Sequence, residues 1–177
     1  MSVKNLGKIV LVILLIALIG ALGYAVITKY FTPAQDIQKT TTKTDIQLAR
    51  ESLITYFNLL NEKRYAEAIK YRGNGYEGLQ NWNPAMDAND HVSLVMTGCE
   101  MNGWRCLKIK DVITQKQTSP ADFEFVVQFA NDNGTLFKRG PCCGATEEEM
   151  PTETDFKYSV KKEGGNFQVM TDPVYTP

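Results

Sequence analysis

The chain is short of the residue types that metal sites and nucleic-acid interfaces use most. His91 is its single histidine, which limits histidine-based metal sites and acid–base catalysis together. It has no run of basic residues, and its formal net charge is −1. A mildly acidic chain of this kind lacks the positive surface that phosphate backbones require. We therefore expect no metal site and no nucleic-acid partner.

Motifs that hold cofactors are also scarce. The chain has no Cys-x-x-Cys unit, the spacing common among thiol-exchange enzymes. Gly73, Gly75 and Gly78 match G-x-G-x-x-G, but this motif binds a dinucleotide only where it follows a strand and opens a helix. Here it follows a predicted helix and leads into an asparagine-rich stretch. The sequence therefore predicts no cofactor and no set of catalytic residues.

What the chain does have is a long apolar run, Ile9–Ile27, which contains no charged residue and is closed by Lys8 and Lys29. As a helix it would be roughly 28 Å long, close to the ~30 Å hydrocarbon core of a bilayer. A soluble core helix of this length would show a polar stripe, and this run shows none. The sequence predicts a transmembrane anchor over residues 9–27, with the lipid bilayer as its partner.

The flanks of this run suggest a topology. Positive charge is dense in residues 1–8, which favours a cytoplasmic tail. Cleavage of a signal peptide is the alternative, although the apolar run is longer than the usual signal-peptide core. Residues 28–43 are threonine-rich without an apolar period and predict a tether. Residues 44–177 then form one extracytoplasmic domain.

The cysteines agree with an extracytoplasmic location. All four follow the tether: Cys99, Cys106, Cys142 and Cys143. An even number outside the cytoplasm indicates disulfides. A bond between the neighbours Cys142 and Cys143 would be strained, so we expect each to pair with Cys99 or Cys106. Free thiols and a zinc site are the alternatives, and the spacing of the first pair is wide for zinc.

The first part of the domain predicts helices. Thr44 and Gln47 have capping-box spacing, and the apolar residues that follow share one helical face up to Asn61. A second, shorter helix is predicted over residues 65–71. Residues 73–89 indicate an irregular connection because they are rich in glycine, asparagine and aromatic residues. A third helix, capped by Asp90, is predicted to reach about Cys99, with a strand as the alternative.

After Cys106 the apolar period changes from helical to two. The alternation slips near Asp111, as a β-bulge would make it, and Asp132-Asn133-Gly134 is the strongest hairpin-turn signal. The strands are expected over residues 107–110, 123–129, 135–138, 156–161 and 167–169. Helices followed by antiparallel strands predict an α+β fold, with a curved sheet of four to five strands packed on the helices.

The order of these elements resembles the nuclear transport factor 2-like superfamily. The short helix Tyr65-Ala66-Glu67-Ala68-Ile69 carries one part of the resemblance. The ending Phe167-Gln168-Val169-Met170, with Asp172-Pro173-Val174-Tyr175, is similar to that of small envelope-anchored members. The resemblance covers residues 45–175 and implies a cone-shaped domain. The superfamily includes isomerases, dehydratases, ligand binders and interaction domains, so the resemblance alone does not choose a function.

Two main functions therefore stay open, and a third, thiol redox exchange through Cys142-Cys143, is disfavoured by the absence of a Cys-x-x-Cys unit. The first is a membrane-anchored, non-catalytic scaffold or binding domain that contacts another envelope protein or its own copy, a layout that resembles the inner-membrane scaffold subunits of type IV secretion machines. Small residues at every fourth anchor position would let two anchors approach closely (Ala17, Ala21 and Ala25). The second is a hollow cone that binds or transforms a small apolar molecule. Its candidate pocket residues are Tyr56, Tyr71, Trp82 and His91.

Overall fold

The computed structural model describes residues 43–177, which form one compact unit. The predicted tail, the predicted anchor and almost all of the predicted tether lie outside the described residues. Within residues 43–177, the helices are too short or too polar to cross a membrane.

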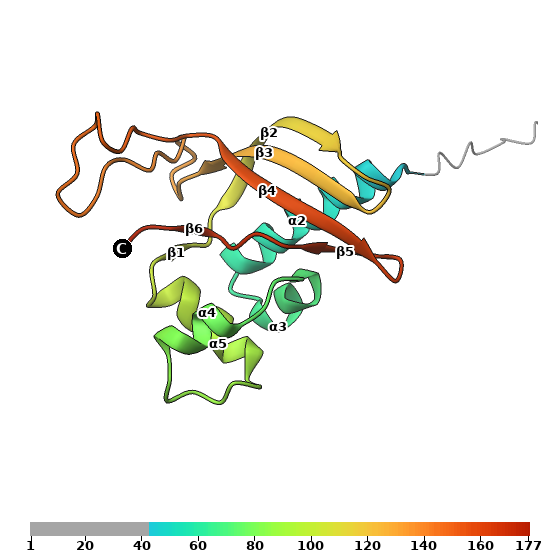
Figure 1. The fold of residues 1–177 in the computed structure, drawn as a ribbon, viewed down its shortest axis with the longest axis horizontal. Helices are drawn as coiled ribbons and strands as arrows, with labels where there is room; N and C mark the ends of the chain where they lie inside the picture. The colour runs from blue at the N-terminus through green and yellow to red at the C-terminus, as the bar shows by residue number, and fades with distance from the viewer. Residues whose placement is uncertain (1–42) are drawn as a thin grey trace, which may run out of the picture. The chain divides into compact units, whose positions relative to one another are not determined.

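Helices come first and antiparallel strands follow, which confirms the predicted α+β class (Figure 1). The helices are α2 (Asp45–Asn61), α3 (Tyr65–Ala68) with its 3₁₀ continuation η1 (Ile69–Tyr71), α4 (Glu77–Trp82) and α5 (His91–Glu100). The strands are β1 (Trp104–Arg105), β2 (Lys108–Gln117), β3 (Asp122–Ala130), β4 (Phe156–Glu163), β5 (Asn166–Val169) and β6 (Val174–Tyr175).

Helix α2 begins and ends where the sequence predicts. The backbone N–H of Thr44 donates to the Gln47 side chain at 2.8 Å, which is one half of the expected capping box. The apolar face of the helix is buried, including Leu53, Phe57 and Leu60. After Asn61 the chain reverses at Lys63, whose φ of +59° is left-handed. Helix α3 then packs against α2.

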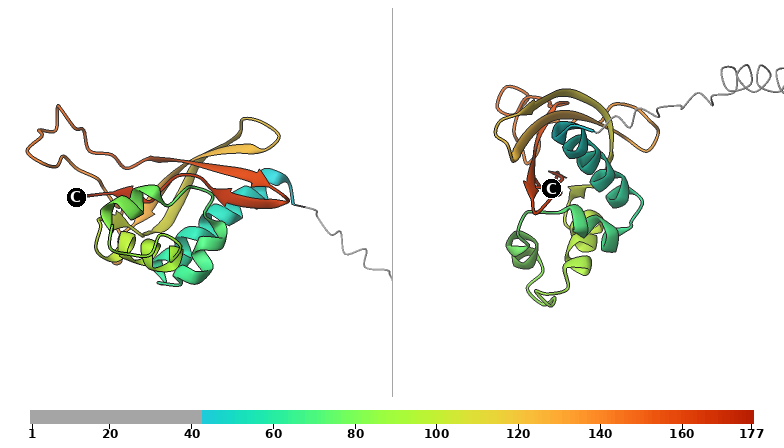
Figure 2. Two further views of the ribbon diagram at one scale, coloured as in Figure 1. Left: turned by 60° about the horizontal axis from the view of Figure 1, so that its bottom comes forward. Right: turned by 90° about the vertical axis from the view of Figure 1, so that its right-hand side faces the viewer.

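The main sheet has four antiparallel strands in the order β2-β3-β4-β5, and α2 contacts all of them. The sheet arches over α2 (Figure 2). Strand β3 alternates as predicted, with Phe123, Phe125, Val127 and Phe129 facing the helix and buried. Two register shifts in β2 bracket Asp111, which confirms the expected bulge and adds a second irregularity.

Two predictions along the chain were wrong. The segment predicted to be irregular, residues 73–89, contains α4, whose single fully buried residue is Leu79. Because only one of its six residues is buried, α4 shows no apolar period in the sequence. The predicted strand over residues 135–138 is only a bridge, Ala130↔Leu136, after which a loop runs to β4. Beyond this bridge Arg139 pairs with Glu153 instead of with β3, so no continuous ladder forms.

A second, smaller sheet joins distant parts of the chain. Strand β1 follows α5, and it pairs antiparallel with β6 near the C-terminus, with Trp104 opposite Tyr175. Sequence reasoning missed this pairing because strands of two residues have no period to detect. The small sheet places the C-terminal residues beside the end of α5.

Candidate functional site

The space between α2 and the main sheet is filled by aromatic side chains. The ring of Phe57 lies 4.9 Å from that of Phe129 and 4.9 Å from that of Tyr158, both edge to face. Tyr56 beside it is fully buried. Such packing leaves the volume that a hollow cone would offer to a ligand occupied by side chains. The predicted pocket residue Tyr56 is therefore part of the core.

Apolar side chains instead gather on the surface at the end of α4. Trp82, Met101 and Tyr175 are 46%, 81% and 44% exposed. The rings of Trp82 and Tyr175 stack with their centroids 5.4 Å apart. With Asn102, Gly103 and Pro177 they line a hollow of about 400 Å³. We call these six residues the Trp82 surface, and exposed aromatic and methionine side chains of this kind are typical of protein interfaces.

A close backbone contact brings the C-terminal residues to this surface. The N–H of Thr176 donates to the carbonyl oxygen of Gly103 at 2.9 Å. Gly103 has a φ of +81°, and a Cβ there would lie 2.5 Å from the backbone oxygen of Thr176. Only glycine satisfies both requirements. Arg105 adds a hydrogen bond from its Nε to the Thr176 hydroxyl at 2.6 Å.

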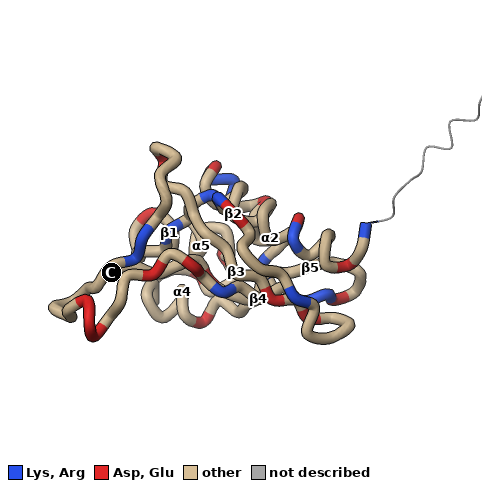
Figure 3. The backbone as a smooth tube through the Cα atoms, turned by 90° about the horizontal axis from the view of Figure 1, so that it is seen from above, with Lys and Arg blue, Asp and Glu red and all other residues tan. Residues whose placement is uncertain are grey.

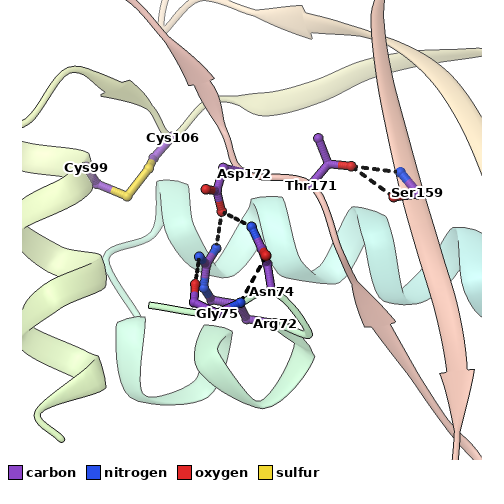
Figure 4. Close-up of polar contacts among 8 residues, drawn as sticks. All are labelled: Arg72, Asn74, Gly75, Cys99, Cys106, Ser159, Thr171 and Asp172. Carbon is purple, nitrogen blue, oxygen red and sulfur yellow. Dashed lines mark hydrogen bonds and ion pairs between the residues drawn. A yellow bond between two sulfur atoms is a disulfide. The ribbon is translucent and has the colours of Figure 1, made fainter. Parts of the chain in front are cut away.

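A disulfide closes the chain beneath this surface. Cys99 at the end of α5 is bonded to Cys106, with a Cα–Cα distance of 5.6 Å (Figure 4). The closed loop contains Met101, Gly103 and Trp104. The expected pairing of Cys142 and Cys143 with these two cysteines was therefore wrong. Cys142 and Cys143, in the loop between β3 and β4, are free thiols.

A buried arginine holds the C-terminal segment from the other side. The Arg72 side chain is 1% exposed, and its Nη1 lies 2.5 Å from Oδ1 of Asp172. Its Nη2 donates to the carbonyl oxygen of Gly75 at 2.6 Å, and Asn74 donates to Asp172 at 3.2 Å (Figure 4). The guanidinium lies over the rings of Tyr76 and Trp104 at 5.0 and 5.2 Å. These contacts offset the cost of burying a charge.

Burial also changes the acidity of the groups around Arg72. It raises the pKa of Tyr56 to about 12, against the opposing attraction of the Arg72 cation. For Arg72 itself, burial opposes the charged form, but Tyr56 and Asp172 outweigh burial and its pKa is raised. Arg72 therefore stays charged, and the cluster has a structural role in fixing the segment after β5.

The other predicted pocket residues are not brought together. His91 is half-buried and stacks on Tyr76 with 3.8 Å between ring centroids. These two rings line a separate hollow of about 330 Å³ beside Glu77 and Gln80. Trp82 lines the hollow of the Trp82 surface, and Tyr71 is half-buried in η1. The four candidates thus lie in different places and do not form one pocket.

Charge and metal chemistry add little to these sites. Acidic and basic residues are interspersed along the tube in Figure 3, without one sign dominating the face it shows. Among the described residues, no three potential ligands of the His, Cys, Asp and Glu types gather as a metal would require.

The chain was compared with family models, with curated proteins and with solved structures, and it matches none of them.

Sequence reasoning missed most of the Trp82 surface. Trp82 was expected to line an interior pocket, Met101 was given no role, and Tyr175 entered only through the resemblance of the chain's ending. Met101 and Tyr175 lie 74 positions apart in the sequence, and the β1–β6 pairing brings them together. The one available signal was the glycine at position 103, since glycine can mark a close backbone approach.

Proposed function

We propose that the chain is a membrane-anchored, extracytoplasmic binding domain whose partner is another protein of the envelope. The observation that carries this proposal is the filled interior: Phe57, Phe129 and Tyr158 occupy the space that a ligand would need. The apolar run over residues 9–27 supplies the anchor, and the resemblance to the nuclear transport factor 2-like superfamily is compatible with an interaction domain.

The Trp82 surface is the part of the domain best suited to bind a protein. Its aromatic and methionine side chains are those that interface centres favour. Three features make it rigid: the Cys99–Cys106 bond, the β1–β6 pairing and the Arg72–Asp172 ion pair. A rigid surface loses little conformational entropy on binding, which favours affinity. No catalytic residue is required for this function.

In-membrane photo-cross-linking tests this proposal with the full chain. A photoreactive phenylalanine analogue replaces Tyr175 or Met101, and the matched control replaces Ile113, which is 47% exposed on β2. We expect one envelope protein to be captured at both test positions and not at the control. The same adduct must disappear in a Trp82→Ser background that keeps the Cys99–Cys106 bond.

The other outcomes are equally informative. Adducts between two copies of the chain would show that the partner is a second copy of the chain and not another envelope protein. Equal capture at all three positions, or capture that survives Trp82→Ser, would remove the Trp82 surface from the proposal. If no protein is captured, a binding role loses its support.

A small-molecule site is the second candidate, and one observation favours it. The stacked rings of Tyr76 and His91 border a hollow with Gln80, whose Oε1 is buried without a hydrogen-bond partner among the described residues. The hollow is open to the surface and near the lower size limit of ligand sites. A ligand there should perturb the imidazole NMR signals of His91, and an unchanged spectrum across a library of apolar compounds would argue against it.

A further inference from the structure

Two neighbouring thiols face each other in the loop between β3 and β4. The Sγ atoms of Cys142 and Cys143 are 2.8 Å apart. A disulfide bond is about 2.03–2.05 Å long, so the two atoms need to approach by less than ~1 Å. Neither thiol has another cysteine to pair with, because Cys99 and Cys106 are bonded to each other.

The backbone at this position is unusual and brings the thiols together. Cys143 has a φ of +60° and Gly144 has a φ of +91°. The N–H of Ala145 donates to the carbonyl oxygen of Cys142 at 3.0 Å, which closes a tight turn. Two consecutive central residues with positive φ are typical of a type I′ turn. A positive φ is uncommon for a residue other than glycine, and such outliers cluster at functional positions.

The two thiols differ in their surroundings. Cys143 is exposed, whereas Cys142 is half-buried. The contact with Cys143 raises the pKa of the Cys142 thiol, while the nearby cation of Arg139 acts in the opposite direction. An external reagent therefore reaches Cys143 first. Cys142 is held next to whatever bond forms at Cys143.

We propose that Cys142 and Cys143 form a dithiol site that takes up oxidising equivalents from a small-molecule disulfide, and that its product is a bond between the two neighbours. The site goes beyond the proposed binding function and does not depend on it. It is a modification site in the loop between β3 and β4, separate from the structural bond at Cys99.

The exchange proceeds in two balanced steps. The Cys143 thiolate attacks one sulfur of R–S–S–R, forms a mixed disulfide with it and releases one RS⁻. The Cys142 thiolate then attacks the Sγ of Cys143, which forms the Cys142–Cys143 bond and releases the second RS⁻. The two thiol protons end on the two RS⁻ groups. The cysteines are oxidised by two electrons, and the external disulfide is reduced to two thiols.

The product should be easily reversed. Cα atoms of neighbouring residues are about 3.8 Å apart across a trans peptide, closer than the usual 4.4–6.8 Å range of disulfides. The Cys99–Cys106 bond, with Cα atoms 5.6 Å apart, lies inside that range. Strained and exposed disulfides are the labile ones. A reductant should therefore open the Cys142–Cys143 bond before the other.

Mass spectrometry of the full chain in detergent tests this proposal. The chain is treated with a mild thiol that leaves Cys99–Cys106 intact, then with glutathione disulfide, then with acid and N-ethylmaleimide. Trypsin cleaves after Arg139 and Lys157, so both thiols lie in one peptide, residues 140–157. We expect this peptide to lose two hydrogens and to carry neither maleimide nor glutathione.

Single-cysteine variants provide the matched controls. In Cys142→Ser and Cys143→Ser the second step is impossible, so the mixed disulfide with glutathione should persist. Because the second step is intramolecular, the wild-type chain should hold at least about tenfold less mixed disulfide than either variant. The Cys99→Ser/Cys106→Ser variant should give the wild-type result for this peptide.

Three results would overturn the proposal. The wild-type peptide could retain glutathione to the same extent as the variants. It could stay fully labelled by maleimide at a dose of glutathione disulfide that modifies both variants. It could also be linked to a second chain, which would make the site intermolecular. Each result is read directly from the mass of the peptide.

Discussion

The guanidinium of Arg72 donates to the carboxylate of Asp172, one hundred positions later in the chain, with 2.5 Å between Nη1 and Oδ1. The adjacent backbone is also joined, because the N–H of Gly73 donates to the carbonyl oxygen of Val169 at 2.9 Å. These contacts attach the segment between β5 and β6 to the helical part of the domain. The position of Tyr175 depends on them.

Removing the carboxylate should be costly because it leaves the buried cation of Arg72 without its counter-charge. We expect Asp172→Ala to lower the free energy of unfolding by about 2–3 kcal/mol, less than for a fully buried pair because Asp172 is partly exposed. Urea unfolding of the full chain in detergent, followed by tryptophan fluorescence, measures this. Asn74→Ala, which removes a neutral donor to the same oxygen, is the control and should cost about 1 kcal/mol or less. A similar loss in both variants would contradict the role of the charge.

The buried hydroxyl of Tyr56 should make the domain sensitive to alkali. Burial raises the pKa of Tyr56 to about 12, whereas an unfolded tyrosine titrates near 10. The unfolded state therefore loses its proton first, and stability falls as the pH rises from about 10 to about 12. For a shift of this size the loss is about 2–3 kcal/mol.

The variant Tyr56→Phe isolates this effect. We expect it to change the free energy of unfolding at pH 7 by about 1 kcal/mol or less. It should make the decline between pH 10 and 12 shallower without abolishing it, because burial also raises the pKa of Tyr65 and Tyr158. Tyr175→Phe, at an exposed ring, is the control. Urea midpoints at several pH values give the comparison, and parallel curves for wild type and Tyr56→Phe would show that another group is responsible.

Opening the Cys99–Cys106 bond should destabilise the domain moderately. The cysteines are seven positions apart, and a loop of that length predicts about 2–3 kcal/mol in the chain-entropy account of disulfides. The variant Cys99→Ser/Cys106→Ser should show this loss in urea unfolding under non-reducing conditions. Cys142→Ser/Cys143→Ser removes the same number of thiols from an exposed loop and should stay close to wild type. If both variants lose equally, the stabilisation does not come from this bond.

Two glycines in neighbouring helices should respond in opposite directions to alanine. A Cβ at Gly98 would lie 2.8 Å from the Trp104 ring and 2.9 Å from Leu79, and both side chains are buried. We expect Gly98→Ala to cost about 1–3 kcal/mol through overpacking. At Gly78 a Cβ would meet no atom within 4 Å, so Gly78→Ala should stabilise by up to about 1 kcal/mol through helix propensity. Equal effects at both sites would contradict the close packing of Trp104 on α5.

Parts of this fold could be read from the sequence because they repeat a local signal. The face of α2 recurs with the helical period, and the alternation of β3 runs from Phe123 to Phe129 without a break. The pairing of Cys99 with Cys106 could not be read, since it depends on where the chain after α5 turns. Arg72 was equally hidden, because nothing in its neighbours marks an arginine whose partner is one hundred residues away.

The candidate site was the least predictable part for the same reason. Trp82 and Met101 end two different helices, and Tyr175 belongs to a strand of two residues. Their proximity follows from three long-range contacts: the β1–β6 pairing, the hydrogen bond between Thr176 and Gly103, and the Arg72–Asp172 ion pair. None of them has a sequence pattern of its own. Tyr56 and Trp82 were therefore assigned to one predicted pocket, while the structure places the first in the core and the second on the surface.

The pairing of β1 with β6 has a consequence for the order of events during synthesis. The ring closed by Cys99 and Cys106 involves residues seven positions apart, so its formation needs no later part of the domain. Trp104 meets Tyr175 only when nearly the whole chain has been made. A nascent chain therefore carries Trp82 and Met101 without Tyr175 beside them, and the complete Trp82 surface is among the last parts of the domain to be assembled.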